Sequence, residues 1–267
     1  MIRPPAVSGR FYPSEAKKLA LEIQQYTASE NKKSLVRGCL VPHAGYMYSG
    51  HVAGAVYSAI EIPALCILLG PRHFPGGEAM AIISEGSWQT PFGNAQVDSE
   101  LATQLKQACP FLREDRVAHQ REHSLEVQIP FLQQLNSNLR FVPVVLATNR
   151  YQELEALGHA VAKMKEAQND QVLVLASTDM NHYESDTITR AKDQKAIDRI
   201  LELDPRGLYD TVQSEDITMC GVAATVAMLV AMRDLGATQA ELVRYATSGD
   251  ITGDREEVVG YAGLIVR

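Results

Sequence analysis

The sequence predicts an α/β fold in which a single domain, residues 1–267, holds a mostly buried mixed sheet covered by helices on both faces. Short runs rich in Val, Ile and Leu recur along the chain and lack the polar alternation of a strand with one solvated face. Segments with helical spacing of apolar residues separate these runs. No linker rich in Pro or Ser and no repeat of fixed period divides the chain. These observations favour one sheet between two helical layers.

The two types of element alternate along most of the chain. In chain order, strands are expected at residues 35–41, 64–69, 80–83, 141–146, 172–176, 242–246 and 258–266, because each run is rich in Val, Ile or Leu. Helices are expected at residues 15–26, 52–60, 99–109, 125–135, 152–167, 187–203 and 222–235, where apolar residues recur with helical spacing. Residues 70–77 and 86–98 contain Gly and Pro and are expected to be structured loops.

Composition and charge exclude several classes of function. The 25 Lys and Arg residues against 32 Asp and Glu leave a net charge of -7, which opposes binding to nucleic acid or to an anionic membrane. The four cysteines are scattered without a C-x-x-C pair, which disfavours a zinc ribbon or a disulfide framework. The first residues carry no apolar signal segment. We therefore expect a cytoplasmic protein that acts on a small molecule, with no nucleic acid or membrane partner.

Several widespread catalytic signatures do not occur in the sequence. It contains no G-x-S-x-G elbow, no G-x-x-x-x-G-K-[ST] loop, no G-x-G-x-x-G turn and no H-E-x-x-H pair. Serine hydrolases, P-loop NTPases, Rossmann dehydrogenases and zincins are therefore disfavoured.

Three histidines follow the ends of predicted strands. His43 comes after the strand at 35–41, His73 after the strand at 64–69, and His182 after the strand at 172–176. Ligands of covered sheets gather beyond the strand ends, so these side chains are expected to meet although they are distant in sequence. One such histidine is usually a hydrogen-bonded structural residue, but three in equivalent places give a metal or catalytic centre comparable weight.

His123 and Glu126 are three residues apart at the start of a predicted helix and share one of its faces. The pair can ligate a metal or orient a substrate. Spacing alone favours the simpler interpretation, in which the glutamate stabilises the helix start.

Cys220 precedes the predicted helix at 222–235. The dipole at a helix start favours thiolate, which makes this cysteine a candidate metal ligand or nucleophile. Most free cysteines are instead small buried apolar residues. That description suits Cys39, Cys66 and Cys109 better, since two lie within strands and one ends a helix.

Six segments, in order along the chain, resemble the Memo family (mediator of cell motility), whose bacterial and archaeal members are called AmmeMemoRadiSam system protein B. The segments are residues 3–13 (RPPAVSGRFYP), 42–46 (PHAGY), 70–73 (GPRH), 122–126 (EHSLE), 177–182 (STDMNH) and 220–221 (CG). The resemblance implies a fold similar to the class III extradiol dioxygenases, which hold non-haem Fe(II) at the end of a mixed sheet. It also implies that His43, His73 and Cys220 are metal ligands, with His182 and Asp179 beside them and His123 in the same cleft.

The resemblance also indicates a departure from those dioxygenases, which use two histidines and a carboxylate. Cys220 stands at the third position, and a thiolate is softer than a carboxylate. The cofactor expected is therefore a metal ion, with Fe(II) or copper favoured and zinc as the alternative, in a redox role. Ring cleavage therefore does not follow from the resemblance alone.

Our leading hypothesis is a cytoplasmic metal-dependent oxidoreductase, or a protein of redox or metal handling, whose substrate the sequence does not name. His182 is expected to act as an acid/base or auxiliary ligand oriented by Asp179. Tyr48, His123 and Glu126 are expected to bind the substrate, a small molecule or peptide, in the cleft.

Two alternatives come from other classes. One is a non-catalytic binding module that receives a peptide or a partner protein in the same cleft. The other is a metal-free hydrolase or transferase with Cys220 as nucleophile and His182 as base.

Overall fold

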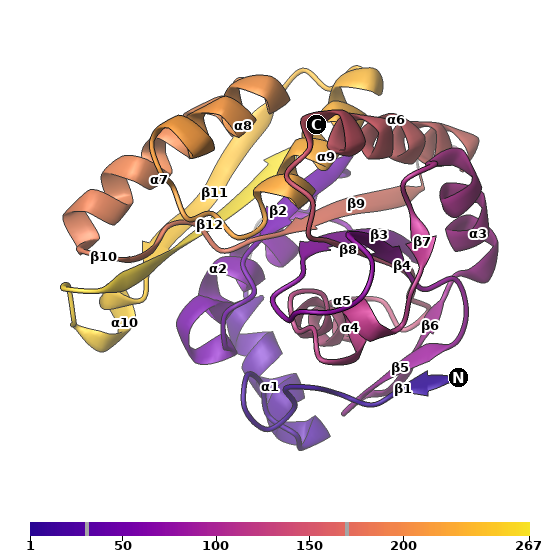
Figure 1. Cartoon of the computed structure of the whole chain (residues 1–267). Helices are drawn as coiled ribbons and strands as arrows, with labels where there is room; N and C mark the ends of the chain where they lie inside the picture. Colours follow the sequence, from indigo (N-terminus) through magenta and orange to yellow (C-terminus); the bar gives the residue numbers. More distant parts are fainter. Residues whose placement is uncertain (30–31, 169–170) are drawn as a thin grey trace.

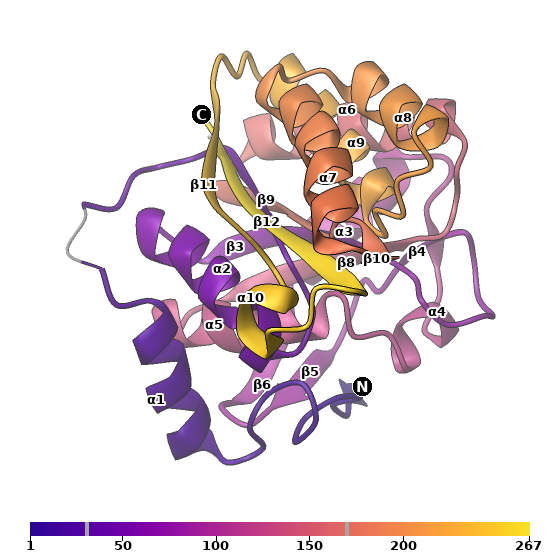
Figure 2. The same cartoon turned by 90° about the vertical axis from the view of Figure 1, so that its left-hand side faces the viewer.

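A mixed sheet of twelve strands runs through the molecule, and helices lie on both sides of it (Figures 1 and 2). This computed structural model describes residues 1–29, 32–168 and 171–267. The strands are β1 (Ile2–Arg3), β2 (Gly38–Val41), β3 (Leu65–Pro71), β4 (Met80–Ile82), β5 (Ser87–Thr90), β6 (Gly93–Val97), β7 (Arg113–Glu114), β8 (Arg140–Leu146), β9 (Val172–Ser177), β10 (His182–Glu184), β11 (Ala240–Thr247) and β12 (Val258–Val266). The helices are α1 (Ala16–Tyr26), α2 (Tyr46–Ala59), α3 (Ser99–Ala108), α4 (Val117–Gln120), the 3-10 helix η1 (Glu126–Gln128), α5 (Ile129–Leu135), α6 (Tyr151–Ala167), α7 (Asp186–Leu201), α8 (Pro205–Ser214), α9 (Val222–Asp234) and α10 (Gly249–Thr252).

Four neighbouring parallel strands, in the order β8, β3, β9 and β2, form the centre of the sheet. Every residue of β2, β3 and β9 is buried, as expected for apolar strands covered on both faces. β12 pairs antiparallel with β2, which makes the sheet mixed. Because the central strands are parallel, their carboxyl ends lie along one edge.

The helices form two layers. α9 packs against β2, β3, β8 and β9, with α6 and α8 outside it. This helix is apolar around most of its circumference and is buried accordingly. α2 packs against β2, β11 and β12 on the other face, and α1 lies against α2 (Figures 1 and 2). Both faces of the central strands are thereby removed from water.

The predicted α/β class, with a large sheet between helices, is confirmed. Each of the predicted strands overlaps an observed strand, and each predicted helix overlaps an observed helix. The strand expected at residues 35–41 is shorter, because β2 begins only at Gly38.

Residues 86–98 differ from the loop expected there. They contain the antiparallel pair β5 and β6, whose turn ends at Gly93 with a φ of 102°. Polar residues in these strands hide their pattern, and glycine accommodates the positive φ that the turn needs. Helix α8 was also not predicted, although Asp204 caps it by accepting from Gly207 N and Pro205 occupies its first turn.

No helix within the described part of the chain combines the length and the apolar character needed to cross a membrane.

Candidate metal centre

The carboxyl ends of the central strands bring residues from distant parts of the sequence to one place. His43 follows β2, His73 follows β3, and Asp179 follows β9. His123 reaches the same place from the segment between α4 and η1, and Cys220 from the segment before α9. The parallel order of β3, β9 and β2 explains why these segments meet.

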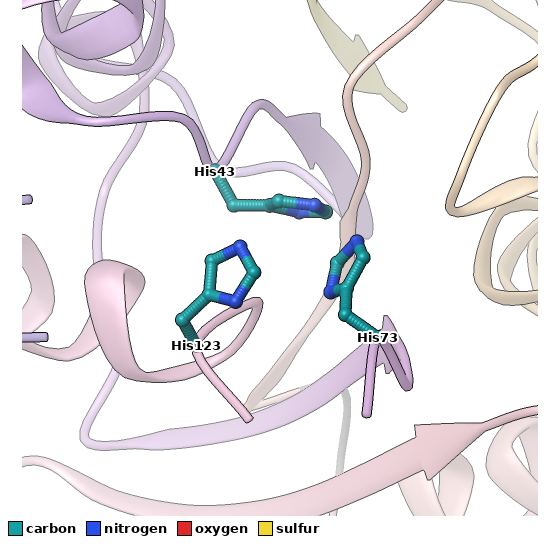
Figure 3. A group of neighbouring side chains, drawn as sticks. All are labelled: His43, His73 and His123. Carbon is teal, nitrogen blue, oxygen red and sulfur yellow. The ribbon is translucent and has the colours of Figure 1, made fainter. Parts of the chain in front are cut away.

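Three imidazole rings face one another at this edge of the sheet (Figure 3). His43, His73 and His123 each offer one ring nitrogen, and these nitrogens lie within 4.8 Å of one another. The ring centroid of His73 is 5.2 Å from that of His43 and 4.5 Å from that of His123. Such a group of nitrogen donors suits a transition metal ion.

Burial keeps at least two of these rings neutral. It lowers the pKa of His43 well below its usual value, and the nearby His73, His123 and His182 lower it further. Burial also lowers the pKa of His123 to about 4, against the opposing effect of Glu122. Neutral imidazole is the form that binds metals, so both rings are ready to act as ligands at neutral pH.

Hydrogen bonds determine which nitrogen of His43 is free. The hydroxyl of Ser177 donates its single proton to the carbonyl oxygen of Ser124 at 2.6 Å. His43 Nδ1 lies 2.9 Å from the same hydroxyl oxygen and must therefore be the donor in that contact. The lone pair of His43 is thus left on Nε2.

Glu122 determines which nitrogen of His73 carries the proton, as Ser177 does for His43. Its side chain has no exposed surface, and Oε1 lies 2.8 Å from His73 Nδ1. Although burial raises its pKa, hydrogen bonds from His73 and other donors lower the pKa of Glu122 to about 2. An ionised carboxylate can only accept, so His73 donates from Nδ1 and keeps its lone pair on Nε2. The backbone N–H groups of His73, His123 and Ser124 also donate to Glu122.

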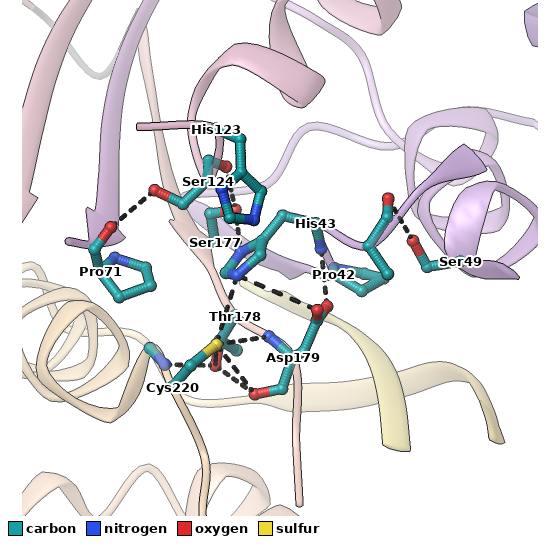
Figure 4. Close-up of polar contacts among 12 residues, drawn as sticks. Pro42, His43, Ser49, Pro71, His123, Ser124, Ser177, Thr178, Asp179 and Cys220 are labelled. Carbon is teal, nitrogen blue, oxygen red and sulfur yellow. Dashed lines mark hydrogen bonds and ion pairs between the residues drawn. The ribbon is translucent and has the colours of Figure 1, made fainter. Parts of the chain in front are cut away.

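Cys220 places a sulfur beside the histidine group (Figure 4). Its Sγ lies 3.3 Å from His43 Nε2. Ligand bonds of about 2.0 Å to nitrogen and about 2.3 Å to sulfur put the two donors of one ion roughly 3.3 to 3.6 Å apart. The pair is therefore spaced like two donors of one ion, whereas the group of donors that lie within 4.8 Å of one another comprises the three histidines without Cys220.

Gly221 allows the Cys220 segment to approach β9 this closely. A Cβ atom at Gly221 would lie 2.4 Å from the carbonyl oxygen of Ser177 and 2.4 Å from Thr178 Cβ. Gly221 N donates to Thr178 Oγ1 at 2.9 Å, and Asp179 N donates to Cys220 Sγ at 3.2 Å. The residue after Cys220 therefore has to be glycine for steric reasons.

The acidity of Cys220 differs from what its place before a helix predicts. Burial, and next the charge of Asp179, raise the pKa of the thiol above its usual value, and these effects outweigh the hydrogen bonds that lower it. Metal-free Cys220 is therefore a thiol at neutral pH, and the expected thiolate character is not present without an ion. This removes the main support for a metal-free nucleophile.

Asp179 and His182 lie near each other but have separate partners. Asp179 Oδ1 accepts from His43 N at 2.8 Å, and burial raises the pKa of this carboxyl. His182 Nδ1 lies 2.9 Å from the carbonyl oxygen of Thr218, which can only accept, so His182 also has its lone pair on Nε2. The ring that Asp179 was expected to orient is thus oriented by Thr218.

Tyr48 and Glu126, which were also expected to bind substrate, have different surroundings. Tyr48 is on α2 and packs against a small cluster that includes Tyr261. Glu126 is buried and accepts from Arg3, from Tyr12 OH and from two backbone N–H groups of the N-terminal segment. Its contacts are those of an anchor for that segment.

The residues that orient the histidines are not among those that the sequence predicts for the site. Ser177 ends a strand, Glu122 directly precedes His123, and Thr218 precedes Cys220 by two residues. Their adjacency to candidate ligands was a usable signal for a supporting role. Their partners, which lie 134 residues away for Ser177, 49 for Glu122 and 36 for Thr218, required the fold.

The fold and the site together define a class: an α/β protein whose parallel strands end in a histidine-rich site suited to a metal ion. The chain belongs to the Memo family, because the family model described as "Memo-like protein" matches residues 3–265. A MEMO1 family protein of Methanopyrus kandleri is 39% identical over 281 residues, which cover 100% of this chain and 99% of that protein. One of Methanothermobacter thermautotrophicus is also 39% identical, over 99% of this chain and 100% of that protein.

A solved structure supports the fold independently of sequence. The crystal structure of an uncharacterized protein from Escherichia coli K12 has a TM-score of 0.55 to this chain and covers 84% of it and 98% of its own length. The sequence identity is 10%, so the likeness concerns the fold alone.

Proposed function

We propose that this Memo-family chain is a metal-dependent oxidoreductase, or a protein of redox or metal handling, whose metal ion is held by His43, His73 and Cys220. His123 completes the set as a further nitrogen donor. The observation that carries the proposal is the 4.8 Å grouping of the three histidines with Cys220 Sγ 3.3 Å from His43.

The chemistry of the donors supports a copper or iron ion, with zinc as the alternative. Neutral imidazoles bind zinc, copper and iron, and a thiolate favours Cu(I) and Zn(II) over hard ions. Copper or iron bound here would supply one-electron redox chemistry.

The chain's own residues would position the ion and move protons. Ser177 and Glu122 hold His43 and His73 with the lone pair on Nε2, which removes the cost of selecting a tautomer on binding. Cys220 releases its proton when it becomes a ligand. His182, with Nε2 free and Nδ1 on Thr218 O, is suited to exchange a proton with a bound substrate.

Metal titration under anaerobic, reducing conditions tests the proposal. We expect tag-free protein to bind one equivalent of Cu(I) or Fe(II), and His43→Ala to weaken that binding by at least about 100-fold through loss of a ligand. His159→Ala is the matched control, because His159 is exposed and pairs with Asp234 away from the site. Parent protein that binds no copper, iron or zinc would refute the proposal.

Redox chemistry needs a separate measurement. We expect the Cu(I)-loaded or Fe(II)-loaded protein to consume oxygen in the presence of an external thiol, and His182→Ala to slow this consumption while retaining the metal. Equal oxygen consumption by loaded protein and by free metal at the same concentration would leave metal handling as the supported function and refute the oxidoreductase.

A further inference from the structure

A cavity of about 590 Å³ lies beside the candidate metal centre, on the side of Cys220. Its walls come from the segment after β8, from α6 and α8, and from the segment between α8 and α9 together with the start of α9. Its volume is in the range of small-molecule sites. It also lies beyond the carboxyl end of a central parallel strand, where ligands of covered sheets bind.

Two residues connect this cavity to the metal centre. Cys220 lines the cavity and places its Sγ 3.3 Å from His43 Nε2. Thr218 also lines it, and its carbonyl oxygen accepts from His182 Nδ1 at 2.9 Å. A molecule in the cavity would therefore contact Cys220 and the segment that orients His182.

The lining indicates the chemistry of the occupant. Thr148, Asn149, Gln213 and Thr218 supply hydroxyl and amide groups for hydrogen bonds. Asp216 is the charged side chain of the lining in the described part of the chain, and no Lys, Arg or His accompanies it there. Lys192 is nearby through the carbonyl oxygen of Asp216, but its ammonium is paired with Glu184 at 2.8 Å. Apolar side chains make up most of the rest of the lining, so the cavity offers partners to polar groups beside apolar walls, and the carboxylate of Asp216 repels anions.

We propose that this cavity binds a small polar organic molecule without negative charge and presents it to the Cys220 side of the metal centre. The proposal rests on the proposed function for the identity of that molecule as substrate. The other part of the proposal, that molecules reach Cys220 through the cavity with a preference set by their charge, does not depend on a bound metal.

Charge-matched methanethiosulfonate reagents test this path in metal-free protein. The Cys220 thiolate attacks the sulfenyl sulfur, forms a mixed disulfide and releases methanesulfinate, while the thiol proton goes to solvent. Cys39, Cys66 and Cys109 have no exposed surface, so Cys220 is the expected site of modification, to be verified by mass spectrometry. Each rate is divided by the rate with glutathione, and ratios between reagents cancel the thiolate fraction of Cys220.

The expected order of rates follows from the lining. Reagents with hydroxyethyl and trimethylammonioethyl tails should react at least about threefold faster than the sulfonatoethyl reagent at low salt, because one carboxylate acts on the tail at short range. The hydroxyethyl tail should also react faster than a propyl tail, which cannot use the polar groups. Equal rates for the sulfonate and the neutral reagents, or a faster propyl reagent, would overturn the proposal.

Two pairs of variants test whether Asp216 causes the charge preference and whether the reagents reach Cys220 through the cavity. Asp216→Asn should remove most of the charge preference, and Asn suits this position because Asp216 has a φ of 49°. Glu215→Gln is the control, since Glu215 pairs with Lys195 at 2.7 Å and is not part of the lining. Gln213→Trp should fill the cavity and slow all reagents about tenfold, whereas Ser214→Trp, on the next residue of α8, should not.

The outcomes separate the two proposals. If Gln213→Trp and Ser214→Trp react alike, Cys220 is reached by another route and the cavity is not its binding site, even where metal titration succeeds. If the charge and filling effects appear but no metal binds, the cavity stands and the metal-dependent function fails.

Discussion

Replacing Glu122 with Gln should loosen the metal site through one histidine. The carboxylate accepts four hydrogen bonds, from His73 N, His73 Nδ1, His123 N and Ser124 N. A glutamine amide has one accepting oxygen and one donating nitrogen, so a buried donor at this site is left facing another donor. An unpaired buried donor costs about 1 to 3 kcal/mol.

The pKa of Glu122 gives a second value for the stability that Glu122→Gln should lose. A carboxyl whose pKa falls from 4.5 when unfolded to about 2 when folded contributes about 3 kcal/mol of stability. The sign follows from the depressed pKa: this contribution is fully present above the unfolded pKa and is lost as the pH falls through about 2. Both values predict that Glu122→Gln lowers the free energy of unfolding by roughly 2 to 3 kcal/mol at pH 7.

Metal affinity distinguishes a positioning role from a structural one. Loss of a partner that orients a metal-binding histidine lowers metal affinity about 10- to 100-fold, and we expect this loss in calorimetric titrations of Glu122→Gln. Glu126→Gln is the matched control, because Glu126 is equally buried and also accepts four hydrogen bonds, none of them from a histidine. Equal loss of affinity in both variants would refute the role assigned to Glu122.

Three further predictions concern neighbouring residues. Cys220→Ser exchanges a soft donor for a weak neutral oxygen and should reduce Cu(I) or Zn(II) affinity strongly in competition titrations, with a smaller loss for hard ions, whereas His182→Ala should keep most of the affinity; the reverse pattern would exchange ligand and neighbour. Gly221→Ala should push Cys220 away from β9 and lower both metal affinity and melting temperature, because its Cβ would clash at 2.4 Å; unchanged values would contradict this steric account. Burial raises the pKa of Asp193 to about 7, so stability should fall as the pH rises from about 4 through 7, and Asp193→Asn should flatten that slope in urea unfolding; a parent protein without the slope would contradict the shift.

The strands and helices were largely predictable because elements that are buried on both faces consist almost entirely of apolar residues. β3 and β9 are nearly continuous apolar runs, and α9 is an apolar helix. The β5–β6 hairpin was not predictable in this way, since its strands carry Gln, Asn and Gly at exposed positions. Short polar strands of this kind depend on pairing partners that a local pattern does not contain.

The candidate ligands were predictable to a similar degree, and for a related reason. His43 and His73 follow apolar strands, so their meeting needs only the assumption that those strands are parallel and lie close together in one sheet, where β9 separates them. His123 follows no strand of the central sheet, and its place in the group depends on Glu122, which binds both it and His73. A carboxylate that joins two segments is visible only when both segments are in place.

The orienting acceptors explain why the site depends on several separate segments. His43 is held by a hydroxyl at the end of β9, His73 by a carboxylate before η1, and His182 by a carbonyl before α9. Each acceptor leaves the lone pair on Nε2 of its ring, although the three acceptors differ in chemistry and in origin. Because no acceptor serves all three rings, each histidine can be disturbed alone by changing its own partner. The acceptors, more than the histidines themselves, therefore determine whether the site presents lone pairs or N–H groups to an ion.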